Sequence, residues 1–205
     1  MVYTITLAST FENMANILSF IALIIAITIH EFSHALTADR LGDPTPRSQN
    51  RVSLNPLNHL DPVGTIMMLL VHFGWGKPVP IDPYNFAHPK RDEMLVAVAG
   101  PGSNLILAGI LSIIWHFFPS QIIIIFVYIN VALAVFNFLP IPPLDGSKIF
   151  LNLLPVDKAV EWEAAFERYG FFILVVLLFL PVGGSNIISL AISPIINIIL
   201  ALLLG

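Results

Sequence analysis

Long apolar runs alternate with short polar or proline-rich stretches along most of the chain. A helix that crosses a bilayer needs about 20 predominantly apolar residues. Five runs come close to this requirement: residues 14–41, 94–118, 121–139, 169–181 and 187–204. The fourth run is short, and we expect its helix to begin upstream, near residue 160. The pattern predicts an all-α polytopic membrane protein with about five transmembrane helices.

Composition agrees with a membrane environment. Hydrophobic residues make up 57% of the 205 positions and charged residues 11%, whereas a typical soluble domain has about 25% charged residues. We therefore expect the lipid bilayer to surround much of the chain. The net charge of −4 gives no sign of a nucleic-acid partner, and we predict none. Cysteine is absent, so a metal ion would have to be bound by nitrogen and oxygen ligands.

Basic residues indicate the orientation in the membrane. All nine lie in two connections: Arg40, Arg47, Arg51, Lys77, Lys90 and Arg91 in the first, and Lys148, Lys158 and Arg168 in the second. Turn residues at 119–120 and 181–186 predict tight links between the other spans. With five spans both basic connections lie on one side, which the positive-inside rule makes cytoplasmic. We expect a multi-pass protein of the prokaryotic cell membrane, with its N-terminus outside and its C-terminus inside.

The first long connection, residues 43–92, is too rich in turn residues to be one helix. The stretches "RVSLNPL", "TIMMLLVHFGW" and "KPVPI" are typical of short extended or membrane-dipping pieces. We expect a membrane-associated, β-rich or irregular segment that folds against the helices. The whole chain, residues 1–205, is predicted to form one domain, with a core at about 14–155 and a C-terminal helical pair at about 158–205.

Three ionisable side chains lie near the end of the first apolar run, in "IHEFSHAL". His30 and His34 are four residues apart, so on a helix they share one face and can bind a single zinc ion. Glu31 is placed to act as a base on zinc-bound water. The alternative is that these groups only link helices. Ionisable residues in a span usually mark function, and three of them within five residues favour the metal site.

A catalytic zinc ion needs a third protein ligand and one open position. Asp145 is the carboxylate in "NFLPIPPLDG", where prolines break the helix as the third span returns to the side of His34. Asp61 and His59 in the first connection remain rivals for this role. Three further histidines have no partner at ligand spacing and are expected to lie at interfaces or in packing: His72, His88 and His116.

"HEFSH" and "NFLPIPPLDG" together resemble the site-2 protease family of intramembrane zinc metalloproteases, whose paired motifs are HExxH and NxxPxPxLDG. The resemblance covers residues from about 20 to 150. It implies that one zinc ion is bound by His30, His34 and Asp145, and that Glu31 is the catalytic base.

Two asparagines are weaker site candidates. Asn137, the first residue of the second motif, matches a family position that contacts the substrate or the transition state, although its amide could instead pack between helices. Asn104, in "AGPGSN", could line the site or bond between helices.

The resemblance implies a zinc-dependent endopeptidase that cuts single-span membrane proteins in or near their transmembrane segment, as in regulated intramembrane proteolysis. We expect the compact form of the family, without PDZ or CBS domains. Residues 74–81, "GWGKPVPI", are a candidate strand edge for an unwound substrate, the alternative being a plain surface loop. The alternatives are a membrane metal-binding or transport protein and a catalytically inactive scaffold of the same fold. The residues identify neither an oligomeric state nor a regulatory membrane partner.

Overall fold

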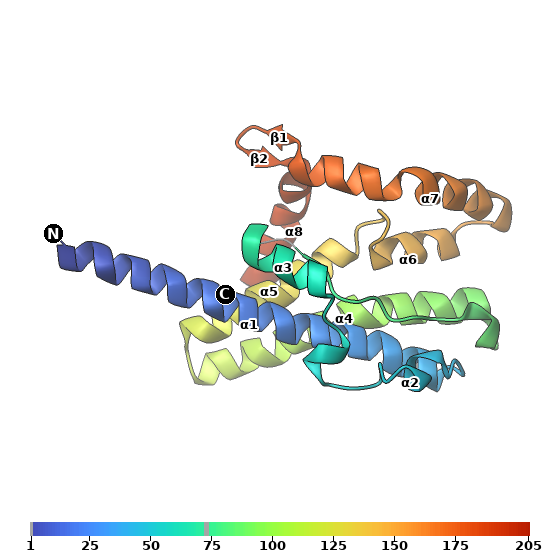
Figure 1. The fold of residues 1–205 in the computed structure, drawn as a ribbon, viewed down its shortest axis with the longest axis horizontal. Helices are drawn as coiled ribbons and strands as arrows, with labels where there is room; N and C mark the ends of the chain where they lie inside the picture. The colour runs from blue at the N-terminus through green and yellow to red at the C-terminus, as the bar shows by residue number, and fades with distance from the viewer. Residues whose placement is uncertain (1, 72–73) are drawn as a thin grey trace.

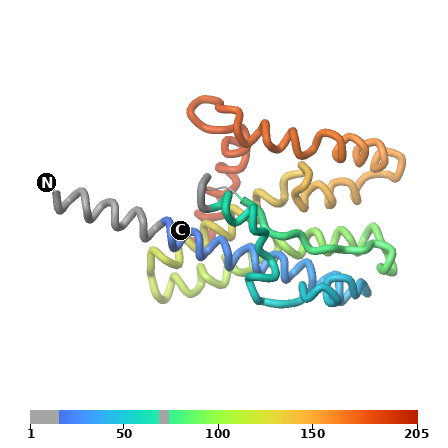
Figure 2. Tube along the Cα trace, in the orientation of Figure 1, coloured from blue at the N-terminus to red at the C-terminus, as the bar shows by residue number. Residues whose placement is uncertain are grey.

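Helices make up most of the chain in the computed structural model (Figure 2). The structure describes residues 2–71 and 74–205, and it describes side chains for residues 16–68 and 74–205. Among the described residues, three helices are long and apolar enough to cross a membrane: α1 (Val2–Arg40) through its part Asn16–Arg40, α4 (Pro89–Phe117) and α8 (Ile187–Leu204). Two other helices fall at the third and fourth predicted spans: the shorter apolar α5 (Gln121–Asn137), and α7 (Val156–Phe179), which is charged in its first half. The chain is therefore a helical membrane protein, as predicted, whereas the count of five spans is not confirmed.

Short links join neighbouring helices where the turn residues predict them. Ser120 caps α5, and its hydroxyl accepts a hydrogen bond from the Ile122 N–H at 3.3 Å. Between α7 and α8 the chain forms a small antiparallel hairpin of β1 (Pro181–Val182) and β2 (Ser185–Asn186). Both tight links of the sequence analysis are therefore present.

Helix α4 lies at the centre of the bundle and packs against α1, α5, α8 and α6 (Asp145–Leu153). In Figure 1, α1 and the α4–α5 hairpin run side by side, and α6 and α7 lie above α4. One buried apolar cluster joins three of these helices through Ala108 of α4, Val131 of α5 and Ile196 of α8. This packing brings the end of α1, the middle of α4 and the start of α6 close together.

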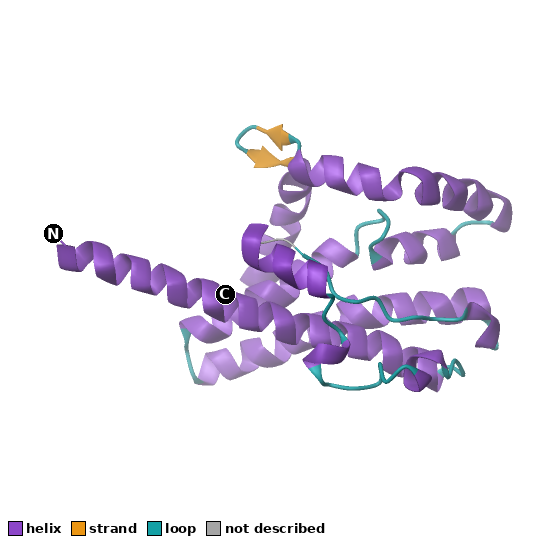
Figure 3. Ribbon diagram, viewed as in Figure 1, coloured by secondary structure: helices purple, strands orange, loops and turns teal. Residues whose placement is uncertain are grey.

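The connection between α1 and α4 is mostly irregular (Figure 3). It contains α2 (Thr45–Ser48), η1 (Pro56–Asn58), α3 (Pro62–Val71) and η2 (Pro83–Asn85). In its described residues the single β pairing is the bridge between Leu60 and Gly76, so the β-rich character is not confirmed. Residues 65–71, the first part of "TIMMLLVHFGW", lie in helix α3, which the Asp61 carboxylate caps by accepting from the Gly64 N–H at 2.8 Å.

Asp43 ties the two ends of this connection together. Its buried carboxylate accepts hydrogen bonds from the Thr45 N–H at 3.0 Å, the Asp82 N–H at 2.8 Å and the Asn85 side-chain amide at 2.8 Å. A fully buried carboxylate needs such partners to offset its loss of water. The connection is therefore anchored at the end of α1, independently of the ionisable cluster.

Candidate metal centre

His30, His34 and Asp145 converge on one small volume. The two histidines project from the same face of α1, and Asp145 is the first residue of α6. The Nε2 atoms of His30 and His34 are 3.0 Å apart, and Asp145 Oδ2 lies 3.0 Å from the first and 3.2 Å from the second. Ligands placed 2.0–2.1 Å from a tetrahedral zinc ion are about 3.3 Å apart. The three atoms therefore have nearly the spacing that a zinc ion requires.

The hydrogen bonds behind the two imidazoles fix which nitrogen faces this volume. His30 Nδ1–H donates to Asn104 Oδ1 at 2.8 Å, and His34 Nδ1–H donates to the Val96 carbonyl at 2.7 Å. In the neutral rings each Nε2 therefore presents a lone pair. Asp145 Oδ2 is buried without a hydrogen-bond partner. Two lone pairs and a carboxylate oxygen facing one another are stabilised by a cation, and this N₂O set with an open position fits catalytic zinc.

A chain of amides connects His30 to two other helices. Asn104 of α4 and Asn130 of α5 are fully buried. The Asn104 amide nitrogen donates to the Ala26 carbonyl at 3.0 Å and to Asn130 Oδ1 at 2.9 Å, which turns its own oxygen towards His30. Asn130 in turn donates to the Phe126 carbonyl at 2.8 Å. Asn104, predicted either to line the site or to bond between helices, makes contacts of both kinds. Asn130 was not among the predicted site residues, although an amide within an apolar run is a usable signal.

Gly100 lets α4 approach the two imidazoles closely. A Cβ at this position would lie 2.3 Å from His34 Nε2 and 2.7 Å from His30 Nε2. No side chain fits there without displacing a ring or moving the helix. Glycine is therefore needed here for space.

Asp145 is held by a similarly close contact at the start of α6. A Cβ on Gly146 would lie 2.3 Å from the Phe138 carbonyl oxygen and 2.4 Å from that of Leu139. Ser147 donates its hydroxyl to the Leu144 carbonyl at 2.7 Å. The glycine after the aspartate thus allows the broken end of α5 and the first turn of α6 to pack together, which turns Asp145 towards α1.

Glu31 lies beside this ligand set, and its side chain is 14% exposed. Two groups from the long connection approach it. Its Oε2 is 3.8 Å from Arg51 Nη2, and a Cβ on Gly76 would come within 3.4 Å of its Oε1. Arg51 entered the sequence analysis only as a basic residue of a connection. Nothing in the local sequence places it near Glu31, because the contact depends on how the connection folds.

The rival ligands lie elsewhere. Asp61 caps α3, and His59 is buried with its Nε2 at 2.6 Å from the Ser53 carbonyl. Among the described residues, the group able to hold a metal ion is His30, His34 and Asp145, without either rival.

The remaining candidates have packing or capping surroundings. Asn137 lies at the end of α5, half-buried, and donates one amide hydrogen to the Leu133 carbonyl at 3.0 Å. His88 precedes α4 as its cap residue, and His116 donates to the Ser112 carbonyl at 2.8 Å. His72 lies outside the described residues.

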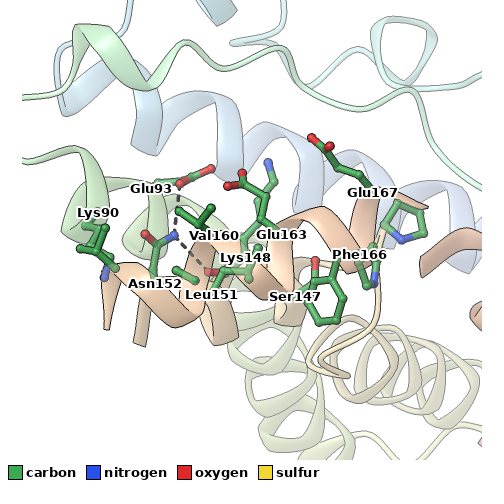
Figure 4. Close-up of a pocket in the computed structure, with 14 residues that line it drawn as sticks. Lys90, Glu93, Ser147, Lys148, Leu151, Asn152, Val160, Glu163, Phe166 and Glu167 are labelled. Carbon is green, nitrogen blue, oxygen red and sulfur yellow. Dashed lines mark hydrogen bonds between the residues drawn. The ribbon is translucent and has the colours of Figure 1, made fainter. Parts of the chain in front are cut away.

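A separate cavity of about 520 Å³ lies between α6, the first half of α7 and the start of α4 (Figure 4). Acidic and basic side chains line it together, among them Glu93, Glu163, Lys90 and Lys148. Asn152 of α6 donates to Glu93 Oε2 of α4 at 3.1 Å, which joins two of the lining helices. None of the three converging ligands lines this cavity, which therefore lies apart from the metal centre.

Comparison with known proteins gives a consistent set of relatives. A family model described as "Peptidase family M50" matches residues 118–181, a range that includes Asp145. The chain is 39% identical over 178 residues to "Putative zinc metalloprotease YwhC" of Bacillus subtilis. The aligned region covers 80% of this chain and 81% of that protein. It is 33% identical over 173 residues to "Putative zinc metalloprotease Rip2" of Mycolicibacterium smegmatis, covering 77% of this chain and 65% of that protein. No solved structure gives a significant match.

Proposed function

Since the chain belongs to the site-2 protease family, peptidase family M50, we propose that it hydrolyses a peptide bond in or near the transmembrane segment of a single-span membrane protein. The observation that carries the proposal is the convergence of His30, His34 and Asp145 next to Glu31, with α1 contributing three of the four side chains. Ionisable groups in a spanning helix are expensive to keep there, and they usually mark function.

The proposed chemistry divides between the bound metal and the protein. When bound at the three ligands, a zinc ion would act as a Lewis acid on the scissile carbonyl and on the attacking water. Glu31 takes the proton from that water and delivers it to the leaving amine. Asn137 has a second amide hydrogen besides the one it donates to Leu133, and we assign it to the oxygen that becomes negative during attack. Asn104 acts from behind His30 by holding its Nδ1–H.

A helical substrate hides its peptide bonds in its own hydrogen bonds, so it has to unwind before it is cut. We propose that residues 74–81 receive the unwound backbone by β-augmentation. Support comes from the bridge between Gly76 and Leu60, which gives this segment extended pairing on one side. A Cβ on Gly76 would lie 3.4 Å from Glu31 Oε1, so a strand added at this segment would run near the base.

We also propose the orientation that the basic residues favour. Both basic connections would face the cytoplasm, and water would reach the metal centre from that side. This orientation requires α5 and α7 to cross the bilayer in addition to the three helices that are long and apolar enough. A cysteine-accessibility scan of the loops with a membrane-impermeant reagent in intact cells tests it. Cysteines at residues 119–120 should be labelled, and labelling of the basic connections instead would contradict the proposal.

The proposed function is tested by cleavage of a single-span reporter in liposomes. We expect wild-type protein to cut the reporter and Glu31→Gln to cut it at least about 10²-fold more slowly, because the base is lost. The variant should keep its zinc, since Glu31 is not among the three ligands. Equal cleavage by the two proteins would refute the proposal. Zinc binding without any cleavage would favour a metal-binding role instead.

A further inference from the structure

Arg51 is buried beside Glu31, with 3% of its surface exposed. Burying a guanidinium group is costly unless other polar groups replace its water. Here two main-chain carbonyls accept its hydrogen bonds and one carboxylate lies nearby, while Nε is buried without a hydrogen-bond partner. Arg51 Nη1 donates to the Pro78 carbonyl at 2.7 Å, Nη2 donates to the Lys77 carbonyl, and Nη2 lies 3.8 Å from Glu31 Oε2.

The two carbonyls belong to the segment proposed to receive the substrate backbone. This segment is also fixed to the chain before α3, since the Lys77 N–H donates to the His59 carbonyl at 2.7 Å. It lies against α1 next to the proposed base, since a Cβ on Gly76 would lie 2.8 Å from Ile27 Cγ2 and 3.4 Å from Glu31 Oε1. One guanidinium group thus holds the carbonyls of residues 77 and 78.

Arginine is suited to this position by its shape. Its five N–H donors lie in one rigid plane, so a single side chain can bond two carbonyls and still present a charge to a third group. A lysine ammonium has the same charge on a flexible stem but cannot hold two carbonyls in a fixed plane. Arg51 therefore links the position of the 77–78 backbone to the position of the Glu31 carboxylate.

We propose that Arg51 is a positioning residue for proteolysis, which fixes the 77–78 backbone relative to Glu31 so that a substrate strand and the base are in register. The inference rests on the proposed function. A displacement of about 1 Å between reacting groups can lower a rate about 10²-fold, and a group that sets this distance controls kcat without touching the substrate.

Other bonds hold the connection in place when the guanidinium is removed. The Asp43 carboxylate anchors its two ends, and the Lys77 N–H keeps its bond to His59. Neither of these contacts involves Arg51 or a metal ligand. Loss of the Arg51 side chain is therefore expected to shift the segment locally while the fold and the zinc site persist.

The test compares Arg51→Ala and Arg51→Lys with wild type, with Glu31→Gln and with the control Arg47→Ala. Arg47 lies in the same connection, but its side chain is 67% exposed and pairs with Asp39 at 2.6 Å. For each purified protein, zinc content, kcat and KM on the single-span reporter are measured, with and without millimolar guanidinium ion. The cavity left by Arg51→Ala offers that ion the place of the missing group.

We expect Arg51→Ala to keep its zinc and lose about 10- to 100-fold in kcat, with KM changed less than about threefold. Guanidinium should restore kcat several-fold in Arg51→Ala but not in Glu31→Gln, and Arg51→Lys should stay slow. Activity near wild type, a change confined to KM, or zinc loss in step with activity would each overturn the inference. So would failure of both Arg51 variants to fold, which would make the role structural. A wild type no faster than Glu31→Gln would instead refute the proposed function itself.

Discussion

Replacing Gly100 by alanine tests the metal centre with one added methyl group. The new Cβ would lie 2.3 Å from His34 Nε2, 2.5 Å from His34 Cε1 and 2.7 Å from His30 Nε2. Both imidazoles are also held by their Nδ1 bonds, to Asn104 and to Val96. The rings cannot move aside and keep their place opposite Asp145, so the overlap has to be relieved at the expense of metal-ligand geometry.

The size of the effect follows from the overlap. Overpacking a filled site by one methyl group costs about 1–3 kcal/mol. If the strain is released only when the rings leave the ligand position, zinc affinity falls by about 5- to 150-fold. The matched control is Gly109→Ala on the same helix, where an added Cβ meets nothing within 4 Å. There alanine should stabilise α4 slightly, by about 1 kcal/mol or less, because glycine is the poorer helix former.

The assay is competition for zinc between the purified proteins and a chromophoric chelator in detergent. Thermal unfolding of the metal-free proteins is recorded beside it, to separate a weaker site from a weaker fold. We expect Gly100→Ala to lose zinc at a lower chelator concentration than Gly109→Ala. If the two variants bind zinc equally well, the imidazoles do not form the site that the contacts with α4 describe.

Three further predictions concern the same surroundings. Asn104→Leu should weaken zinc binding about 10- to 100-fold in the chelator competition, as is typical when a partner of a metal-bound histidine is lost. Asn130→Leu should also weaken zinc binding in this assay, but by a smaller factor. Gly146→Ala should destabilise the protein by about 1–3 kcal/mol, because its Cβ would meet the Phe138 carbonyl at 2.3 Å; a melting temperature equal to that of Gly109→Ala would contradict this. Chelating the zinc should lower the melting temperature of wild type but not of Asp145→Ala, since only a protein that binds the ion is stabilised by it.

Much of the ligand set follows from local sequence. The spacing of His30 and His34 fixes their common face once α1 is helical, and an apolar run of that length is predicted to be a helix. Asp145 is different, because residues 115 positions apart in the chain meet only through the packing of α4 and α6. The prolines of the second motif favour Asp145 over its rivals, and the resemblance to the family strengthens that preference.

The long connection was harder to predict because tertiary contacts determine its structure. Periodicity in "TIMMLLV" does not separate a buried strand from a short helix, and the structure has the helix α3 there, capped by Asp61. The contact between Arg51 and Glu31 depends on carbonyls 26 and 27 residues further along the chain, which no local pattern predicts. Asn130 could have been noticed as a buried amide, but its link to His30 runs through a second helix.

X-ray absorption at the zinc edge of the purified protein tests the metal centre most directly. We expect one zinc ion per chain, with two imidazole nitrogens and a carboxylate oxygen at about 2.0–2.2 Å. The imidazole signal should disappear when His30 and His34 are both replaced. A protein that holds no zinc, or holds it in a shell without imidazole, would contradict the assignment of His30, His34 and Asp145.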